Sequence, residues 1–305
     1  MRTEKKVAII VAVMMVILGS VMAASAFRTA EAEMKTSYKD EDYQEKKIEI
    51  AESFDDIEIK LLDRDLEILR SSDNKAYFEC REGKRAKFEA YVSGGTLKVE
   101  EELESKVFNI DGLFVDGINF DTKLYLPKDS YNNLTVSLGS GDINSKENFS
   151  FRDIDVVVGS GDVYLSNLAS EEVKGKTGSG QVWFYDSKAK RVQIKSGSGD
   201  IAVENLACER TFEAEVSSGD VTLTEVTASQ SFDVSTGSGD ITLRSCDSMN
   251  INMKSGSGKI RGSVKTAKSF DAKSGSGDVN VPESGNGGNC VIRTGSGDID
   301  ITVEN

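Results

Sequence analysis

Aspartates recur along the chain at nearly constant spacing, most of them closing a Gly-Ser-Gly-Asp segment. They are Asp142, Asp162, Asp200, Asp220, Asp240, Asp278 and Asp298. If equivalent turns stack, these carboxylates form a ladder, and a ladder of like charges is a candidate cation site. A glycine-rich repeat ending in Asp and an apolar residue also binds calcium in β-roll proteins. Asp200, Asp220 and Asp240 are the calcium candidates.

Other features of the ladder favour a simpler role. Gln181 and Lys259 interrupt it, and calcium requires six to eight oxygen ligands. The calcium-binding repeat is also about nine residues long, much shorter than the spacing here. Because Asp readily bonds the backbone of its own turn, we expect these side chains to satisfy turn amides, and we expect no cofactor.

Composition argues against several activities. The chain has no histidine, so the commonest general base and metal ligand is missing. Its net charge of −14 repels phosphate backbones, which makes nucleic acid an unsuitable partner. The Gly-Ser-Gly turns resemble phosphate-binding loops, but no Gly-Lys-Ser/Thr follows them. We therefore expect a protein that is not an enzyme.

The Gly-rich segments define nine repeats, spaced 19 or 20 residues apart. They begin at Gly139, Gly159, Gly178, Gly197, Ser217, Gly237, Gly256, Gly275 and Gly295. Four places after each start stands a β-branched residue, and five places before it stands an apolar one. Apolar and polar residues alternate on both sides of the turn, which is typical of strands with one buried face. Each repeat is therefore predicted to be strand, turn, strand.

A single repeat cannot bury its apolar row alone, so the repeats must stack. A fixed period in this range is typical of solenoids, whose parallel strands lie about 4.8 Å apart. We predict an all-β fold, a single-domain β-solenoid (parallel β-helix-like) of 19–20-residue rungs, preceded by one N-terminal transmembrane helix. The extra residue of the longer repeats is expected in the turn opposite the glycines.

Four segments are predicted along the chain. Residues 1–27 form a transmembrane anchor or signal peptide, 28–46 a charged spacer, 47–128 irregular rungs and a cap, and 129–305 the regular repeat. Within the third segment, "IEIKLLDRDLEIL" matches the repeat without its glycines, and "YVSGGTLKV" is a second echo of it.

The N-terminus carries a membrane signal. Arg2, Lys5 and Lys6 precede a charge-free run over residues 7–27, which as a helix is long enough to span a bilayer. The length of the run favours an uncleaved anchor, and cleavage after Ala26 as a signal peptide is the alternative. Under both interpretations the rest of the chain lies outside the cytoplasm.

The stretch "LYLPKDSYNNLTVSLGSGDI" and the recurring Gly-Ser-Gly-Asp turns resemble the bacterial putative-adhesin family, a domain of unknown function built from β-strand repeats. The resemblance covers residues 47 to 305. It implies a cell-envelope protein, often tethered by one N-terminal helix, and it assigns no catalytic residue.

Three aromatic residues are the candidate ligand-binding residues. Tyr164 and Trp183 occupy the same outward position on consecutive repeats, and Tyr185 faces the same way as Trp183. Exposed aromatic clusters often bind sugars or protein surfaces. The competing interpretation, which the frequency of aromatics in strands favours, is that these rings only pair across neighbouring strands.

Four cysteines, Cys80, Cys208, Cys246 and Cys290, permit two disulfides in an exported protein. Cys290 lies in the apolar row, and Cys208 aligns with alanines of other repeats. Cys208 and Cys246 lie two rungs apart, roughly 9–10 Å by strand spacing, which exceeds disulfide reach. We therefore expect mostly buried, free thiols.

The sequence ends halfway through a repeat, in "GSGDIDITVEN". An unpaired edge promotes association unless charges blunt it. We expect this last strand to be the open edge, with Asp300 and Glu304 keeping the protein monomeric.

These expectations give three functional hypotheses. The first is an envelope-anchored, non-enzymatic binding or adhesin-like solenoid whose partner is a cell-wall polymer or a surface protein. The second is a sensory ectodomain that acts through a membrane partner. The third is a carbohydrate-active enzyme, for which the uniform rungs leave little room to build a loop-walled groove.

Overall fold

The computed structural model describes residues 43–83, 86–103 and 121–304. The chain divides into two compact units, and the larger comprises Glu45–Arg81, Lys87–Glu102 and Asn119–Asn305. Within the described ranges all regular secondary structure is β, and no helix there could span a membrane. The predicted anchor, residues 1–27, lies outside the described residues, as does the predicted spacer up to residue 42.

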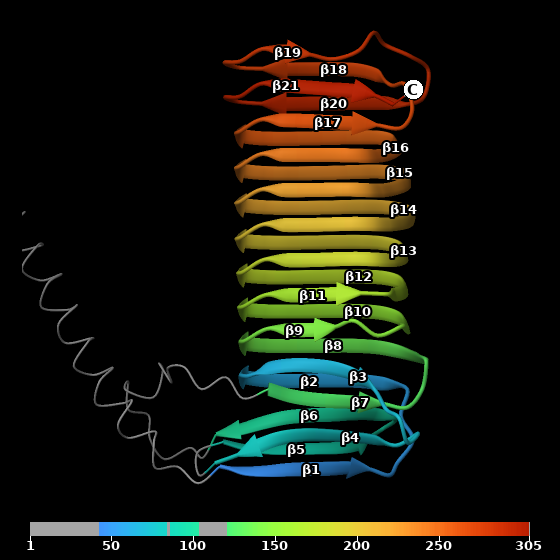
Figure 1. Ribbon diagram of the computed structural model, residues 1–305, viewed down its shortest axis with the longest axis vertical. Helices are drawn as coiled ribbons and strands as arrows, with labels where there is room; N and C mark the ends of the chain where they lie inside the picture. Colours follow the sequence, from blue (N-terminus) through green and yellow to red (C-terminus); the bar gives the residue numbers. More distant parts are fainter. Residues whose placement is uncertain (1–42, 84–85, 104–120, 305) are drawn as a thin grey trace, which may run out of the picture. The chain divides into compact units, whose positions relative to one another are not determined.

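The middle of the larger unit is a ladder of parallel strands that follow one another in chain order (Figure 1). They are β8 (Ser130–Ser140), β9 (Ile143–Ser145), β10 (Phe149–Ser160), β11 (Val163–Ser166), β12 (Leu168–Ser179), β13 (Val182–Ser198), β14 (Ile201–Ser218), β15 (Val221–Ser238), β16 (Ile241–Ser257) and β17 (Ile260–Val264). Each rung pairs with the equivalent residues of the next, as in Val182–Ile201 and Ile201–Val221. The predicted all-β solenoid is confirmed.

The apolar rows predicted from the repeat form the core. Ile201 and Val221 are completely buried, and so is Phe232. Phe232 packs against Phe212 of the rung before it, with ring centroids 5.1 Å apart and ring planes tilted by 34°. Each fully buried side chain of this size contributes roughly 1.5–3 kcal/mol by leaving water, so stacking provides what one rung cannot provide alone.

The second glycine of each turn cannot be replaced without strain by a residue with a side chain, because the backbone of the adjacent rung lies too close. Gly239 has φ of 152°, and a Cβ there would lie 2.0 Å from the carbonyl oxygen of Gly219. A hydroxyl residue before most turns completes the arrangement: the buried Thr236 donates to the same Gly219 oxygen at 2.9 Å. Ser or Thr precedes the turn in six of the nine repeats, and four of these have the full sequence Ser/Thr-Gly-Ser-Gly-Asp.

A second corner lies four residues after the first residue of the strand that follows the turn, and β13 to β16 run through it. Its residues adopt positive φ despite having side chains: Asn167, Asp186, Asn205, Glu225 and Ser245. The register between neighbouring rungs shifts by one residue after this corner: Ala189 pairs with Cys208, but Arg191 pairs with Thr211. The extra residue of the 20-residue repeat therefore lies away from the glycines, as predicted, while the second corner was not predicted.

One degenerate rung precedes the regular ones. It consists of β2 (Asp56–Asp63) and β3 (Asp65–Arg70), which pair in parallel with β8 and β9. Asp65 takes the place of a turn aspartate, because the Asp142 amide donates to its carboxylate at 2.7 Å. The match predicted for "IEIKLLDRDLEIL" is confirmed.

The remaining N-terminal strands lie beyond this rung: β1 (Gln44–Ile50), β4 (Ala76–Glu82), β5 (Ala86–Ser93), β6 (Thr96–Leu103) and β7 (Asp121–Leu126). β6 and β7 extend the parallel ladder from β2 and β3, whereas β4 pairs antiparallel with β7. The expectation that "YVSGGTLKV" echoes the repeat is wrong. Gly94 and Gly95 have φ of 61° and 81°, the geometry of a two-residue hairpin turn.

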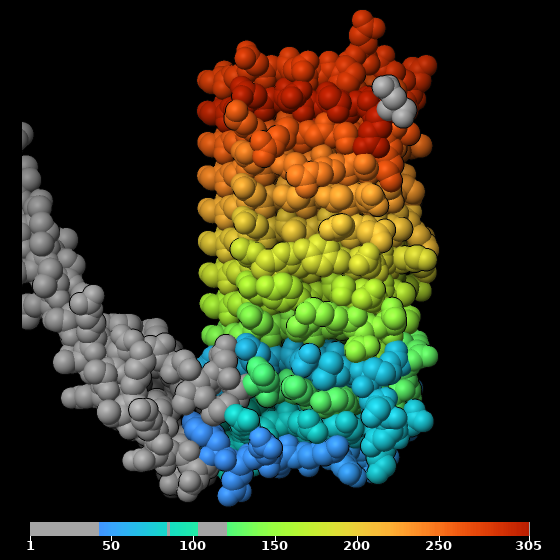
Figure 2. Space-filling view, viewed as in Figure 1, coloured from blue at the N-terminus to red at the C-terminus, as the bar shows by residue number. Residues whose placement is uncertain are grey.

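The C-terminal rungs do not follow chain order. They are β18 (Ser269–Ser274), β19 (Val279–Asn280), β20 (Asn289–Thr294) and β21 (Ile299–Val303). β20 pairs with both β16 and β18, and β21 with both β17 and β19. The last rung of the chain is therefore inserted between its two predecessors, and its deep-red layer lies below the orange-red end layer in Figure 2.

The predicted open edge is therefore wrong, because the strand that carries Asp300 is internal. Pro282 accounts for this order of the rungs: it lies two residues after the end strand β19, and proline is tolerated only where no ladder hydrogen bond is needed. The inward side chains do not decide this order by size alone, because the inserted rung has Ile292 where the end rung has Ala272, but Cys290 where the end rung has Phe270.

Candidate functional site

Tyr164 and Trp183 lie face to face on neighbouring rungs. They are register partners in β11 and β13, their ring centroids are 4.1 Å apart, and their planes differ by 5°. Tyr185 stands two residues further along β13, also half-buried. We call these three residues the aromatic patch.

The neighbours of the aromatic patch are small or polar. Asn144 pairs with Tyr164 on one side, and Ala202 pairs with Trp183 on the other. The indole therefore has a ring against one face and only a methyl group at the equivalent position on the next rung. The small Ala202 side chain leaves room for a flat molecule to stack on the free face of the Trp183 indole.

The phenols of the patch stay protonated well into the alkaline range. Burial raises the pKa of Tyr164, and the nearby Asp162 carboxylate raises it further. Burial also raises the pKa of Tyr185, with a smaller contribution from Glu204. Both hydroxyls are therefore hydrogen-bond donors as well as acceptors at neutral pH.

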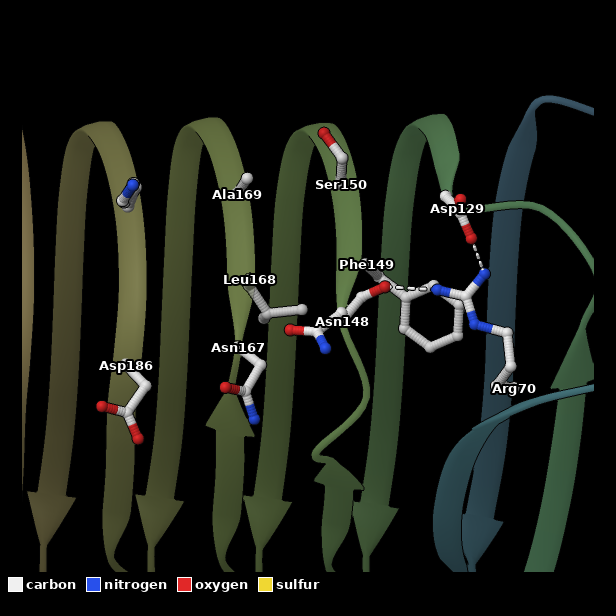
Figure 3. Close-up of a pocket in the computed structure, with 10 residues that line it drawn as sticks. Arg70, Asp129, Asn148, Phe149, Ser150, Asn167, Leu168, Ala169 and Asp186 are labelled. Carbon is white, nitrogen blue, oxygen red and sulfur yellow. Dashed lines mark hydrogen bonds and ion pairs between the residues drawn. The ribbon is translucent and has the colours of Figure 1, made fainter.

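A shallow groove of about 460 Å³ runs along the second corner, and we call it the corner groove. Its lining residues are Arg70, Asp129, Asn148, Phe149, Ser150, Asn167, Leu168, Ala169, Asp186 and Lys188. Figure 3 shows Arg70 directed at both the Asp129 carboxylate and the Asn148 carbonyl. The Arg70 guanidinium also lies 4.7 Å from the centre of the Phe149 ring, which fixes this wall of the groove.

The corner groove begins one residue after the aromatic patch in the sequence of β13, where the strand turns the second corner. Tyr185 is followed by Asp186 at the corner, and Lys188 comes two residues later. The Asn205 amide donates to Asp186 at 2.7 Å, which orders the corner carboxylate. The groove was not predicted, although Asn or Asp at equivalent positions of three successive repeats was a visible signal for left-handed corners.

The turn aspartates accept hydrogen bonds from turn amides, as expected, but these amides belong to the next rung and not to the aspartate's own turn. Asp200 accepts the Asp220 amide at 2.8 Å, and Asp220 accepts the Asp240 amide at 2.7 Å. Each of these contacts uses one carboxylate oxygen. Within the described part of the chain, no group of three or more His, Cys, Asp or Glu residues is arranged to hold a metal ion.

The cysteines are buried and free, as predicted. Cys208 pairs in register with Ala189 and Ala228, and Cys290 pairs with Ile251 and Phe270. Burial raises the pKa of the Cys208 and Cys290 thiols to about 12 and that of Cys246 to about 11. These thiols are consequently unreactive core residues at neutral pH.

Comparison with known proteins identifies a matching family and several solved structures with a similar fold. The model of the Toastrack DUF4097 family matches residues 54–211 and 209–305. One similar solved structure is described as a putative adhesin from Bacteroides fragilis. Its sequence is 16% identical to this one, the TM-score is 0.50, and the match covers 85% of this chain and 97% of that one.

Two structures from Parabacteroides distasonis are also similar. One is described as a putative lipid binding protein, with a TM-score of 0.54, 18% identity, and coverage of 85% of this chain and 96% of that one. The other is described as a putative adhesin, with a TM-score of 0.54, 13% identity, and coverage of 86% and 98%. At such low identity these likenesses concern the fold alone. The curated proteins include no significant match.

Proposed function

The chain belongs to the Toastrack DUF4097 family, and from that starting point we propose that it is an envelope-anchored, non-enzymatic binding protein. In this proposal residues 7–27 hold it in the membrane, and the solenoid presents a contact surface outside the cytoplasm. The observation that carries the proposal is the stacked pair of Tyr164 and Trp183, with Tyr185 beside it.

The chemistry of this surface suits a polysaccharide. Flat aromatic rings bind the apolar faces of sugars, and they lose little side-chain entropy because they are already ordered by stacking. The corner groove next to the patch offers carboxylate, amide and ammonium groups, which can bond sugar hydroxyls. A cell-wall polymer is therefore the partner class that we propose, and a surface protein is the competing outcome.

The protein's only tryptophan makes the proposal directly testable, because Trp183 fluorescence reports from the site itself. Solubilised wall polymers are titrated into the full chain held in detergent micelles. We expect a saturable change in emission, and a weaker response when Tyr164 and Tyr185 are replaced by Thr.

Retention of the full chain on immobilised wall polymer provides the second measurement, because it does not need the tryptophan. The triple change of Tyr164, Trp183 and Tyr185 to Thr should abolish retention. Tyr91→Thr is the matched control, since Tyr91 is an exposed tyrosine of the cap. Retention that survives the triple change while stability falls would show that the patch is purely structural.

A further inference from the structure

Resting on the proposed polysaccharide binding, we infer that Lys188 selects anionic sugar polymers: the net charge of −14 repels a polyanion as a whole, but the Lys188 ammonium pairs locally with one carboxylate or phosphate group in the corner groove. Lys188 lines this groove and lies on the same strand as Trp183 and Tyr185. A polymer stacked on the aromatic patch would therefore extend towards it.

The first observation is that Lys188 differs from the other cations of its strand. Lys190 pairs with Glu171 at 2.8 Å, Arg191 pairs with Glu172 at 3.3 Å, and Lys195 pairs with Glu213 and Glu215 at 3.1 and 2.6 Å. Among the residues that the structure describes, Lys188 makes no ion pair. Its charge is available to a ligand, whereas the others are already neutralised.

The second observation is the space around Lys188. Its register partners on the two neighbouring rungs are Ala169 and Ala207. Ala169 lines the groove, and Ser150 stands next to it on the rung before. These small residues leave the Lys188 side chain without bulky neighbours in its row, so an anionic group can approach the ammonium from the groove.

The third observation concerns the other charges of the groove. The Arg70 guanidinium is already bonded to Asp129 and Asn148, and Asp186 accepts the Asn205 amide. The Asn167 amide nitrogen already donates to the Lys146 carbonyl at 2.8 Å, so Asn167 and Asp186 suit sugar hydroxyl groups through their side-chain oxygens, which accept hydrogen bonds. Lys188 is thus the groove residue best placed to recognise an anion, while its neighbours recognise the rest of the sugar.

Three polymers test this inference. Polygalacturonate is compared with its fully methyl-esterified form, which removes the charge but keeps the sugar, and a glycerol-phosphate polymer serves as the phosphate arm. Binding to the full chain in detergent is followed by Trp183 fluorescence at low and at high salt. We expect the acidic polymer to bind about fivefold more tightly than the ester at low salt, corresponding to one partly exposed ion pair, and salt to reduce the difference.

The decisive variant is Lys188→Ala, with Lys190→Ala as its matched control two residues away. Lys188→Ala should remove the preference for the charged polymer with at most a small loss of ester binding, and Lys190→Ala should leave the preference intact. A stronger response to the phosphate polymer than to polygalacturonate would identify phosphate as the preferred anion.

The outcomes separate the two proposals. Equal binding of the acidic polymer and the ester by the unmodified protein would overturn the role of Lys188 and leave polysaccharide binding standing. An unchanged preference in Lys188→Ala would overturn it as well. If no polymer changes Trp183 emission, the proposed function itself fails.

Discussion

From β10 to β16 each rung stacks on the rung that precedes it in the chain, whereas at the C-terminal end the last rung lies between two earlier ones. Both regions use the same Gly-Ser-Gly-Asp turn and the same apolar rows. The repeat therefore specifies how a rung folds, but not which rung lies next to it. Stacking order is decided by the few residues in which the rungs differ.

Those differences determine which of the two C-terminal rungs can form the exposed end of the stack. The end rung has Pro282 two residues after β19, where no ladder hydrogen bond is needed. A further contact stabilises this order of the rungs. The buried Lys268 ammonium bonds the Asp247 carboxylate at 2.5 Å and the Gly287 carbonyl at 2.8 Å. Lys268 thus ties the loop before β20 to β16, and it is a buried cation with its partners in place.

The largest expected effect compares one substitution in the two regions. Phe232 and Phe270 occupy the same apolar row, but Phe232 is fully buried while Phe270 is half-buried at the end of the stack. Phe232→Ala should lower the free energy of unfolding by about 4 kcal/mol, because it leaves a cavity between two rungs. Phe270→Ala should cost about half as much.

Denaturant unfolding of the two variants measures this difference. If the stack followed chain order, Phe270 would lie on Ile251 and beneath another rung, and the two losses would be similar. Equal destabilisation would therefore contradict the inserted arrangement.

The second prediction compares a turn glycine with a cap glycine. A Cβ on Gly239 would lie 2.0 Å from a backbone oxygen of the adjacent rung, whereas a Cβ on Gly95 would meet nothing within 4 Å. Gly239→Ala should cost about 3 kcal/mol or more, because backbone must move in addition to the strain at positive φ. Gly95→Ala should cost about 1 kcal/mol for the positive φ alone.

Thermal melting of both variants separates the two contributions. Similar losses would mean that the conformation of the glycine matters and the neighbouring rung does not.

The third prediction concerns pH. The folded-state pKa values of Cys208 and Cys290 are raised to about 12, above the value of about 8.5 for an exposed thiol. The unfolded chain therefore loses these protons first, so stability is unaffected below about pH 8.5 and falls as the pH rises towards 12. Each thiol should contribute a loss on the order of 1 kcal/mol per pH unit in this window.

Cys208→Ala tests this directly, since alanine is the residue found at this position on both neighbouring rungs. The variant should unfold with a shallower dependence on pH between 9 and about 11 than the unmodified protein. An identical slope would show that the Cys208 thiol ionises as easily in the folded state as in the unfolded one.

Much of the fold was predictable because the repeat is local information. The apolar rows, the glycine turns and the buried positions of Cys208 and Cys290 all follow from spacing. The second corner and the inserted rung were missed, although Asn167 and Pro282 were visible signals. The corner groove was not predictable in the same way, because it joins Arg70 to Asn148 across 78 residues of sequence. Such a contact depends on the return of the chain from the cap, which no periodicity encodes.

The smallest expected effect is a gain in stability within the regular region. Gly175 faces inward between Val156 and Ile194, in a row whose other members are apolar, and a Cβ there would meet nothing within 4 Å. Its φ lies outside the left-handed region, so alanine fits without strain. Gly175→Ala should raise the free energy of unfolding by about 1 kcal/mol, because it adds apolar burial and restricts the unfolded chain. The reverse change in the same row, Ala214→Gly, should lower it by a similar amount, as measured by denaturant unfolding. A loss of stability in Gly175→Ala would show that this row is already filled.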